Sequence, residues 1–131
     1  MLHPTQFYVN EAWIIFKLND APLSTESDGD FDLIALMDAA SCFILGTATL
    51  ATSSAEISQL EAKRLLKKGQ SHKKQLPSKL FIPGALLASR FAAEAERLKL
   101  AIQRVAEVEL EVFIGEARES FKERFGGGGA Q

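Results

Sequence analysis

Apolar residues occur in short runs along most of the chain, and the form of each run predicts a secondary structure. Bulky aromatic and β-branched side chains from Trp13 to Leu18 predict a first strand over 12–18. Two longer apolar runs predict a second strand over 32–38 and a third over 42–50, joined as a hairpin around 39–41. Because neither run alternates with polar residues, we expect both faces of these strands to be covered.

Turn and capping residues predict where the first helix lies. The segment 19–31 contains Pro22, Gly29 and three aspartates, so we interpret it as an acidic loop. The sequence Ser-Ser-Ala-Glu at 53–56 has the form of a capping box, which predicts that a helix begins there. That helix is expected to end near Gly69, a residue type that favours the left-handed conformation of a helix C-terminus.

The second half of the chain continues as alternating strands and helices. Pro83 and Gly84 end a short apolar run, and Leu87, Phe91 and Ala95 then recur at helical spacing. A polar loop is expected over 69–78, followed by a strand over 79–82 and a helix over 85–99. A further strand is expected over 101–106 and a last helix over 109–125. A flexible glycine-rich tail over 126–131 follows.

The order of these elements predicts the fold class. Three strands come first, followed by helix, strand, helix, strand and helix, which implies antiparallel pairing and then right-handed parallel crossovers. This is the order of the ribonuclease H-like α/β fold, a five-stranded mixed sheet with helices packed on it. We expect a single domain over 1–125.

Composition adds the environment in which this domain is expected to work. With 131 residues, of which 47% are hydrophobic and 24% charged, the chain is typical of one globular domain. Cys42 is the single cysteine and the N-terminus lacks a secretory signal, so a reducing cytoplasm is expected. The apolar segment 33–51 is long enough to cross a bilayer, but Asp38 would cost about 2.5–3.5 kcal/mol there. Two buried strands, and no membrane contact, are therefore expected.

Two short motifs resemble those of integrase and transposase catalytic domains. In that family an N-E-x-W sequence leads into the first strand, and a D-x-x-S-x-x-I-x-G hairpin follows. Here the first motif is Asn10-Glu11-Ala12-Trp13, and the second is carried by Asp38, Ser41, Ile44 and Gly46. The resemblance implies the ribonuclease H-like fold, in which the predicted strands, numbered along the chain, lie in the sheet order 3-2-1-4-5. It also implies that Asp38 is not a metal ligand.

The same resemblance indicates that the catalytic acids are missing. Such enzymes use two or three carboxylates to hold divalent metal ions that activate the nucleophile. The resemblance places the first acid three residues after the tryptophan, where this chain has Phe16. It places the second at the end of the fourth strand, and 80–84 contains no carboxylate. Glu111, Glu116 or Glu119 could supply a helix acid, but one acid cannot hold a metal pair.

Other catalytic chemistry has little support in the sequence. A nucleophilic Cys42 needs a histidine base, and only His3 and His72 exist, one near the terminus and one in a lysine-rich segment. The same three residues do not form a zinc ligand set. No glycine-rich loop opens a helix, so no phosphate-binding loop is expected. We therefore predict no catalytic residue, no metal and no cofactor.

Charge is divided unevenly along the chain. Residues 1–62 hold nine acids and one base, whereas 63–79 holds seven bases and no acid. The candidate anion-binding or partner-binding residues from this basic segment are Lys63, Arg64, Lys67, Lys68, Lys73 and Lys74. Such a segment can be a solvated helix end, or it can bind an acidic protein, a nucleic acid or another copy of the chain.

The last predicted helix carries a second candidate surface. Phe113, Phe121 and Phe125 fall on one helical face, which either covers the sheet or forms a self-association face. The leading hypothesis is a non-catalytic interaction module on a degenerate ribonuclease H-like scaffold, with a protein partner or self-association. The alternative is a protein that binds or processes nucleic acid through 63–79, as a metal-dependent nuclease or polynucleotidyl transferase.

Overall fold

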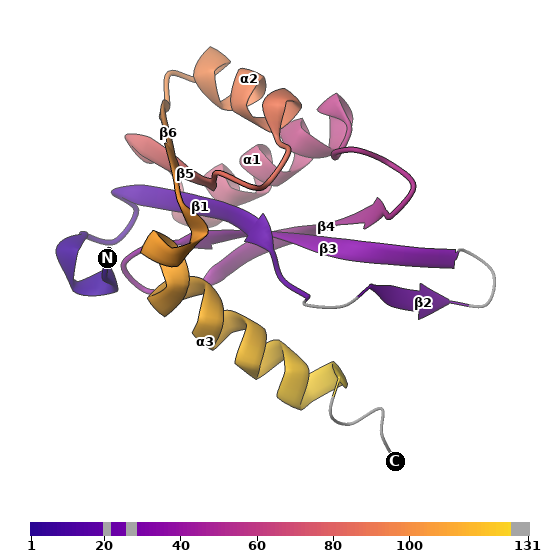
Figure 1. The fold of residues 1–131 in the computed structure, drawn as a ribbon. Coiled ribbons are helices and arrows are strands. Elements are labelled where there is room, and N and C mark those ends of the chain that lie inside the picture. Colours follow the sequence, from indigo (N-terminus) through magenta and orange to yellow (C-terminus); the bar gives the residue numbers. More distant parts are fainter. Residues whose placement is uncertain (20–21, 26–28, 127–131) are drawn as a thin grey trace.

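The computed structural model describes residues 1–19, 22–25 and 29–126, which form one mixed sheet with helices on both faces (Figure 1). The strands are β1 (Ala12–Lys17), β2 (Leu23–Thr25), β3 (Gly29–Asp38), β4 (Ile44–Ala51), β5 (Lys79–Pro83) and β6 (Ala101–Val105). The helices are α1 (Gln59–Lys73), α2 (Ser89–Arg97) and α3 (Glu111–Phe121). Shorter helical turns lie at Pro4–Gln6, Glu107–Leu110 and Lys122–Gly126.

The sheet has the predicted order and one additional strand. β4, β3 and β1 pair antiparallel, and β1, β5 and β6 pair parallel, which confirms the expected order of five strands. β2 pairs antiparallel with the start of β3 and makes the sheet six-stranded. The interpretation of 19–31 as a loop was therefore wrong at 23–25 and 29–31, although 20–21 and 26–28 lie outside the described residues.

The ends of α1 differ from the prediction. The helix begins after Ser58, whose hydroxyl oxygen accepts a hydrogen bond from the backbone N–H of Glu61, and not at 53–56. It continues through Gly69 to Lys73 and ends at Lys74, which adopts the left-handed conformation. Gly69 is a buried position in the helix interior, so the polar loop begins at 74 instead of 69.

The later elements are of the predicted kinds, but the two later helices are shorter than predicted. α2 covers 89–97 of the expected 85–99, because a turn precedes it, and α3 covers 111–121 of the expected 109–125. A 3₁₀ turn precedes α3 and a π-helical turn ends at Gly126. Of the expected tail over 126–131, Gly126 belongs to that turn and 127–131 lie outside the described residues. The domain limits 1–125 stay a prediction.

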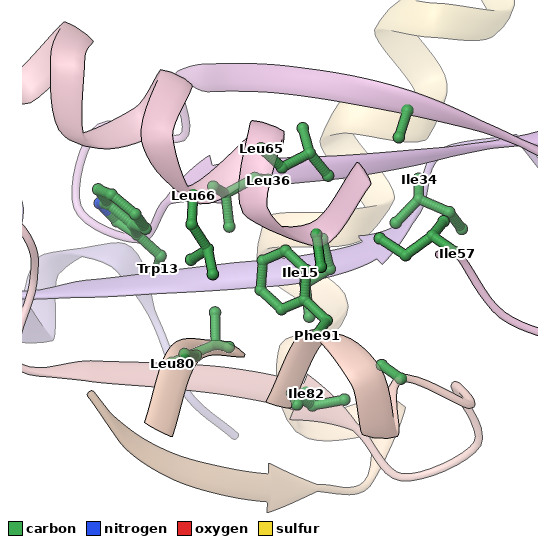
Figure 2. Packing of buried hydrophobic residues seen from close by; sticks show 14 of the residues in the cluster. Trp13, Ile15, Ile34, Leu36, Ile57, Leu65, Leu66, Leu80, Ile82 and Phe91 are labelled. Atoms are coloured by element: carbon green, nitrogen blue, oxygen red, sulfur yellow. The ribbon is translucent and has the colours of Figure 1, made fainter. Parts of the chain in front are cut away.

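β1 is buried on both faces and contributes to two hydrophobic cores. Trp13 and Ile15 point toward α1 and α2, where they pack with Leu66 and Phe91 (Figure 2). The alternate side chains, including Phe16, point to the opposite face and pack with Leu110, Phe113 and Ile114 from the α3 side. The expectation of two covered faces was made for the second and third predicted strands, and it is confirmed for β3, where Ile34 and Leu36 belong to one core and Ala35 and Met37 to the other. It is wrong for the end of β4, where Thr49 and Ala51 are exposed.

The apolar segment 33–51 forms parts of β3 and β4 with a tight turn between them, as expected. Among the described residues, no helix has both the length and the apolar character required to span a membrane.

Candidate functional site

The carboxyl ends of β1 and β5 lie next to each other, because these two strands are parallel neighbours. This edge is where the resemblance places the first two catalytic acids. Phe16 is fully buried in the core under α3, and Pro83 ends β5. Neither residue can ligate a metal through its side chain. Within 1–19, 22–25 and 29–126, no group of three or more His, Cys, Asp or Glu side chains could hold a metal ion.

A guanidinium group from α3 lies at this strand edge instead. Arg118 Nε donates to the backbone carbonyl of Lys17 at 3.0 Å, and its Nη2 lies 3.1 Å from Glu107 Oε1. Lys17, Pro83, Glu107 and Arg118 line a small groove of about 300 Å³ together with Ala85 and Leu86. Two cationic side chains and one carboxylate thus occupy this edge, a combination that repels a divalent cation more than it attracts one.

The two motifs that carry the family resemblance meet in one buried hydrogen-bond network. Asp38 Oδ1 accepts from the backbone N–H of Asn10 at 2.7 Å, and its Oδ2 accepts from the N–H and hydroxyl of Ser41 at 3.0 and 2.7 Å. Asn10 Oδ1 accepts from the indole Nε1 of Trp13 at 2.7 Å, and the Asn10 amide donates to the carbonyl of Gln75. The motif residues therefore hold the β3–β4 turn against the entry to β1.

This network gives Asp38 a structural role. Its side chain is fully buried, and a buried carboxyl group is tolerated only when hydrogen-bond partners surround it. Asn10, which adopts a positive φ of 63°, presents its backbone N–H to that carboxylate. Asp38 thus joins the N–H groups of Asn10 and Ser41 across the β3–β4 turn.

The basic segment forms one exposed face of α1 beside β4. Arg64, Lys67, Lys68, Ser71 and His72 recur at the i, i+3, i+4, i+7 and i+8 spacing of a helix face, and with Leu45 they line an open groove of about 640 Å³. Every polar side chain in this groove can donate hydrogen bonds, and no carboxylate lines it. The groove is therefore suited to an anionic partner. We call it the basic groove.

One residue of the basic groove has a structural partner. The Arg64 guanidinium donates to the carbonyl of Thr47 on β4 at 2.8 Å and to both carboxylate oxygens of Glu61. The hydrogen bonds from Arg64 lower the pKa of Glu61, so this pair stays ionised at neutral pH. Arg64 thus covers the outer edge of β4, while Lys67 and Lys68 remain exposed.

The structure adds an aromatic side chain that the sequence analysis missed. Phe43, 48% exposed, stacks on His72 with ring centroids 4.7 Å apart and an interplanar angle of 11°. Lys73 Nζ lies 5.8 Å from the centroid of the same ring. Phe43 belongs to the β3–β4 turn, twenty residues before the basic segment begins at Lys63, so no local pattern could have linked the two.

The six predicted basic residues are not all equivalent in space. Lys63, Arg64, Lys67 and Lys68 lie on α1, and Lys73 and Lys74 lie at its end. Lys79, the last base of the segment, is separated from them, because its Nζ lies over the ring of Phe81 in the core on the α3 side.

The structure does not bring Cys42 and the histidines into a catalytic arrangement. His3 caps the first 3₁₀ turn through Thr5, and His72 stacks on Phe43. Burial, with smaller contributions from the carboxylates of Glu116 and Asp38, raises the pKa of the Cys42 thiol. The thiol is therefore protonated at neutral pH and is a poor nucleophile.

The predicted aromatic face of α3 is divided between core and surface. Phe113 is fully buried, and its ring centroid lies 6.2 Å from that of Phe7. It covers the sheet and cannot belong to an association face. Phe121 is partly buried against the same core, and the side chain of Phe125 lies outside the described residues.

Comparison with known proteins finds the fold but no sequence family. No family model matches the chain, and no curated protein matches it. The HTLV-2 integrase catalytic core domain in complex with magnesium is similar in its dimeric form, with a TM-score of 0.52 and 10% identity over 73% of this chain and 61% of that chain. Its trimeric form gives a TM-score of 0.51 and 12% identity over 83% and 82%.

A third similar structure is the simian T-cell lymphotropic virus intasome in complex with PP2A regulatory subunit B56 gamma. It has a TM-score of 0.55 and 13% identity over 87% of this chain and 37% of that chain. This chain thus spans 61% and 37% of the first two matched chains. Identities this low show the fold alone, and that fold is the ribonuclease H-like fold of integrase catalytic cores.

Proposed function

We propose that this chain is a non-catalytic interaction module on a ribonuclease H-like scaffold. The observation that carries the proposal is the composition of the strand edge at which such scaffolds hold metal ions. Phe16 and Pro83 stand at the ends of β1 and β5, and the guanidinium of Arg118 binds the last carbonyl of β1. A two-metal mechanism needs several carboxylates at this edge, and Glu107 is already paired with Arg118.

Metal titration combined with a nuclease assay tests this proposal. We expect no heat of binding from Mg²⁺ or Mn²⁺ in calorimetry, and no cleavage of single- or double-stranded DNA or RNA. Glu107→Gln removes the carboxylate at the strand edge, and Glu109→Gln is its matched control on the same 3₁₀ turn. Metal-dependent cleavage by the wild type that persists in Glu109→Gln but disappears in Glu107→Gln would overturn the proposal.

A second candidate function, binding of nucleic acid without cleavage, is favoured by the position of Phe43 beside the basic groove. Non-specific binding to single strands combines lysine or arginine side chains with exposed aromatic rings. Neutralising Lys67, Lys68, Lys73 and Lys74 together to Gln should abolish retention on heparin and on single-stranded DNA. The thermal midpoint should hardly change, because exposed charges contribute about 0–1 kcal/mol each. Equal retention of wild type and variant at low salt would exclude this function.

A further inference from the structure

We propose that this chain associates head to tail with a second copy of itself, with the basic groove of one copy on an acidic groove of the next. The proposal rests on the interaction module proposed above, and it names the partner of that module. The acidic groove lies on the opposite face of the sheet, between α3 and the 3₁₀ turn that precedes it. Its volume is about 450 Å³, and it is lined by Glu107, Val108, Glu111, Ile114, Gly115, Arg118 and Glu119.

The acidic groove carries two carboxylates available to a partner. Arg118, the one cation in its lining, is turned toward the backbone of Lys17 and pairs with Glu107. In the part of the chain that the structure describes, Glu111 and Glu119 form no ion pair and no side-chain hydrogen bond. Among the described residues, their charges therefore have no ion-pair partner, and the same holds for Lys67 and Lys68. Each surface has unpaired charge of the sign that the other needs.

The two surfaces match in length as well as in charge. Glu111, Gly115 and Glu119 occupy positions i, i+4 and i+8 of α3, a stripe about 12 Å long at 1.5 Å per residue. Arg64, Lys68 and His72 form a stripe with the same spacing on α1. At the centre of the acidic stripe, no atom other than those of the chain neighbours of Gly115 and of the adjoining helix backbone lies within 4 Å of the position that its Cβ would occupy. A long lysine side chain can therefore enter between the two carboxylates.

Each groove also has an exposed apolar side chain beside its charges. Val108, 57% exposed, lines the acidic groove, and Phe43, 48% exposed, lies next to the basic groove on His72. Exposed ion pairs contribute about 0–1 kcal/mol each, so charge alone would give weak association. Burial of these two side chains adds apolar area to the contact, at about 25 cal/mol per Å².

The positions of the grooves determine the kind of assembly. α1 packs on the core that contains Trp13, and α3 packs on the core that contains Phe113, on the other face of the sheet (Figure 1). The contact joins two different surfaces, so one such contact leaves one groove free on each copy. A contact of this kind gives rings or open chains that grow with concentration.

Sedimentation velocity with charge-reversal variants tests this arrangement. One variant carries Lys67→Glu and Lys68→Glu, and the other carries Glu111→Lys and Glu119→Lys. At low ionic strength we expect the wild type to associate with rising concentration, and we expect each variant alone to be monomeric. An equimolar mixture of the two variants should associate again. The native acidic groove of the first variant can bind the native basic groove of the second, and the two grooves of reversed charge can also bind each other. High salt should dissociate every complex, since the charges are exposed.

Controls separate this proposal from its alternatives. Glu96→Lys reverses an exposed charge on α2 outside both grooves and should associate like the wild type. Circular dichroism checks that the variants are folded. If a charge-reversal variant does not fold, the neutral double variant takes its place, which is Lys67→Gln with Lys68→Gln or Glu111→Gln with Glu119→Gln.

A wild type that is monomeric at low salt, or a variant that associates without the other, would overturn the proposal. So would a wild type that is monomeric but retained on single-stranded DNA. The nuclease assay tests whether the protein is catalytic, and the sedimentation results do not depend on its outcome. The two proposals can therefore fail separately.

Discussion

The indole ring of Trp13 lies directly against the backbone of α1 at Gly69. A Cβ atom at this position would come within 2.7 Å of Trp13 Cη2 and 3.0 Å of Cζ3. The ring cannot move away easily, because its Nε1 donates to Asn10, whose backbone N–H is bound by the buried carboxylate of Asp38. The hydrogen-bond network of the two motifs therefore determines how closely α1 approaches the sheet.

We predict that Gly69→Ala destabilises the protein although it replaces a helix-interior glycine. Alanine is favoured over glycine in a helix by about 0.8–1.0 kcal/mol. Overpacking a rigid core costs about 1–3 kcal/mol, so the overlap with Trp13 should outweigh that gain. Urea unfolding should show a lower midpoint than the wild type.

Gly115→Ala in α3 is the matched control for this substitution. Apart from its chain neighbours and the adjoining helix backbone, the Cβ of the new side chain would meet no atom within 4 Å. We therefore expect the free energy of unfolding to rise by about 0.5–1 kcal/mol. A higher free energy of unfolding in both variants would show that the Trp13 ring moves to accommodate the new methyl group, and would contradict the prediction.

At the level of elements, α2 depends on a capping residue from another part of the chain. Its N-cap position is Ala88, whose side chain cannot cap the helix. Instead Glu56 reaches this end, where its Oε1 accepts from the backbone N–H of Arg90 at 2.7 Å and its Oε2 from the hydroxyl of Ser89 at 2.7 Å. A carboxylate at a helix N-terminus is stabilised by the free N–H groups and by the helix dipole.

This contact also explains why α1 begins later than expected. Both Ser53 and Ser58 are followed three residues later by a glutamate, so the chain contains two consecutive capping boxes. Local sequence cannot choose between them. Glu56 belongs to the first box, and its use at α2 leaves Ser58 and Glu61 as the start of α1.

We predict that Glu56→Gln lowers stability at neutral pH by about 1–2 kcal/mol and makes it less dependent on pH. Burial by itself raises the pKa of Glu56, but the hydrogen bonds from Arg90 and Ser89 outweigh it and leave the pKa below its usual value of 4.5. The stabilisation is therefore complete above the usual glutamate range and is lost as the pH falls through the lower pKa of the folded state.

Thermal unfolding at several pH values measures this effect. The difference in midpoint between wild type and Glu56→Gln should be largest at neutral pH and should shrink on acidification. Glu96→Gln, at an exposed glutamate of α2, should differ little from the wild type at any pH. A difference between wild type and Glu56→Gln that grows toward acid would contradict the capping role.

At the scale of the whole molecule, one sheet connects two cores. Trp13 and Ile15 of β1 belong to the core under α1, while Ile14 and Phe16 of the same strand belong to the core under α3. Neither core can lose its packing without affecting β1. We therefore expect the described residues to unfold as one cooperative unit.

We predict that Phe113→Ala, on the α3 side, lowers the unfolding midpoint reported by Trp13 on the α1 side. Replacing a fully buried phenylalanine by alanine lowers the free energy of unfolding by about 3–5 kcal/mol. Trp13 is the single tryptophan, so its fluorescence reports one core while far-ultraviolet circular dichroism reports the whole chain. Both midpoints should fall together, whereas Phe121→Ala, at a partly buried position of α3, should have a smaller effect. An unchanged tryptophan midpoint would show that the cores unfold separately.

The sequence by itself determined the fold class, and the resemblance of two of its motifs to integrase catalytic domains implied the order of the sheet. β-branched and aromatic runs mark β1, β3 and β4 because side-chain bulk is a local property, and alternating strand and helix signals permit few right-handed topologies. It also indicated the missing acids, since the residue type at Phe16 is read directly.

Only the tertiary structure decided which distant side chains meet. It brought Phe43 onto His72, Glu56 to the start of α2, and Arg118 to the last carbonyl of β1. It also buried Phe113, because the rotation of α3 about its axis depends on its packing against the sheet. Such contacts depend on the crossing of elements separated by tens of residues, and the pattern within any one segment carries no information about them.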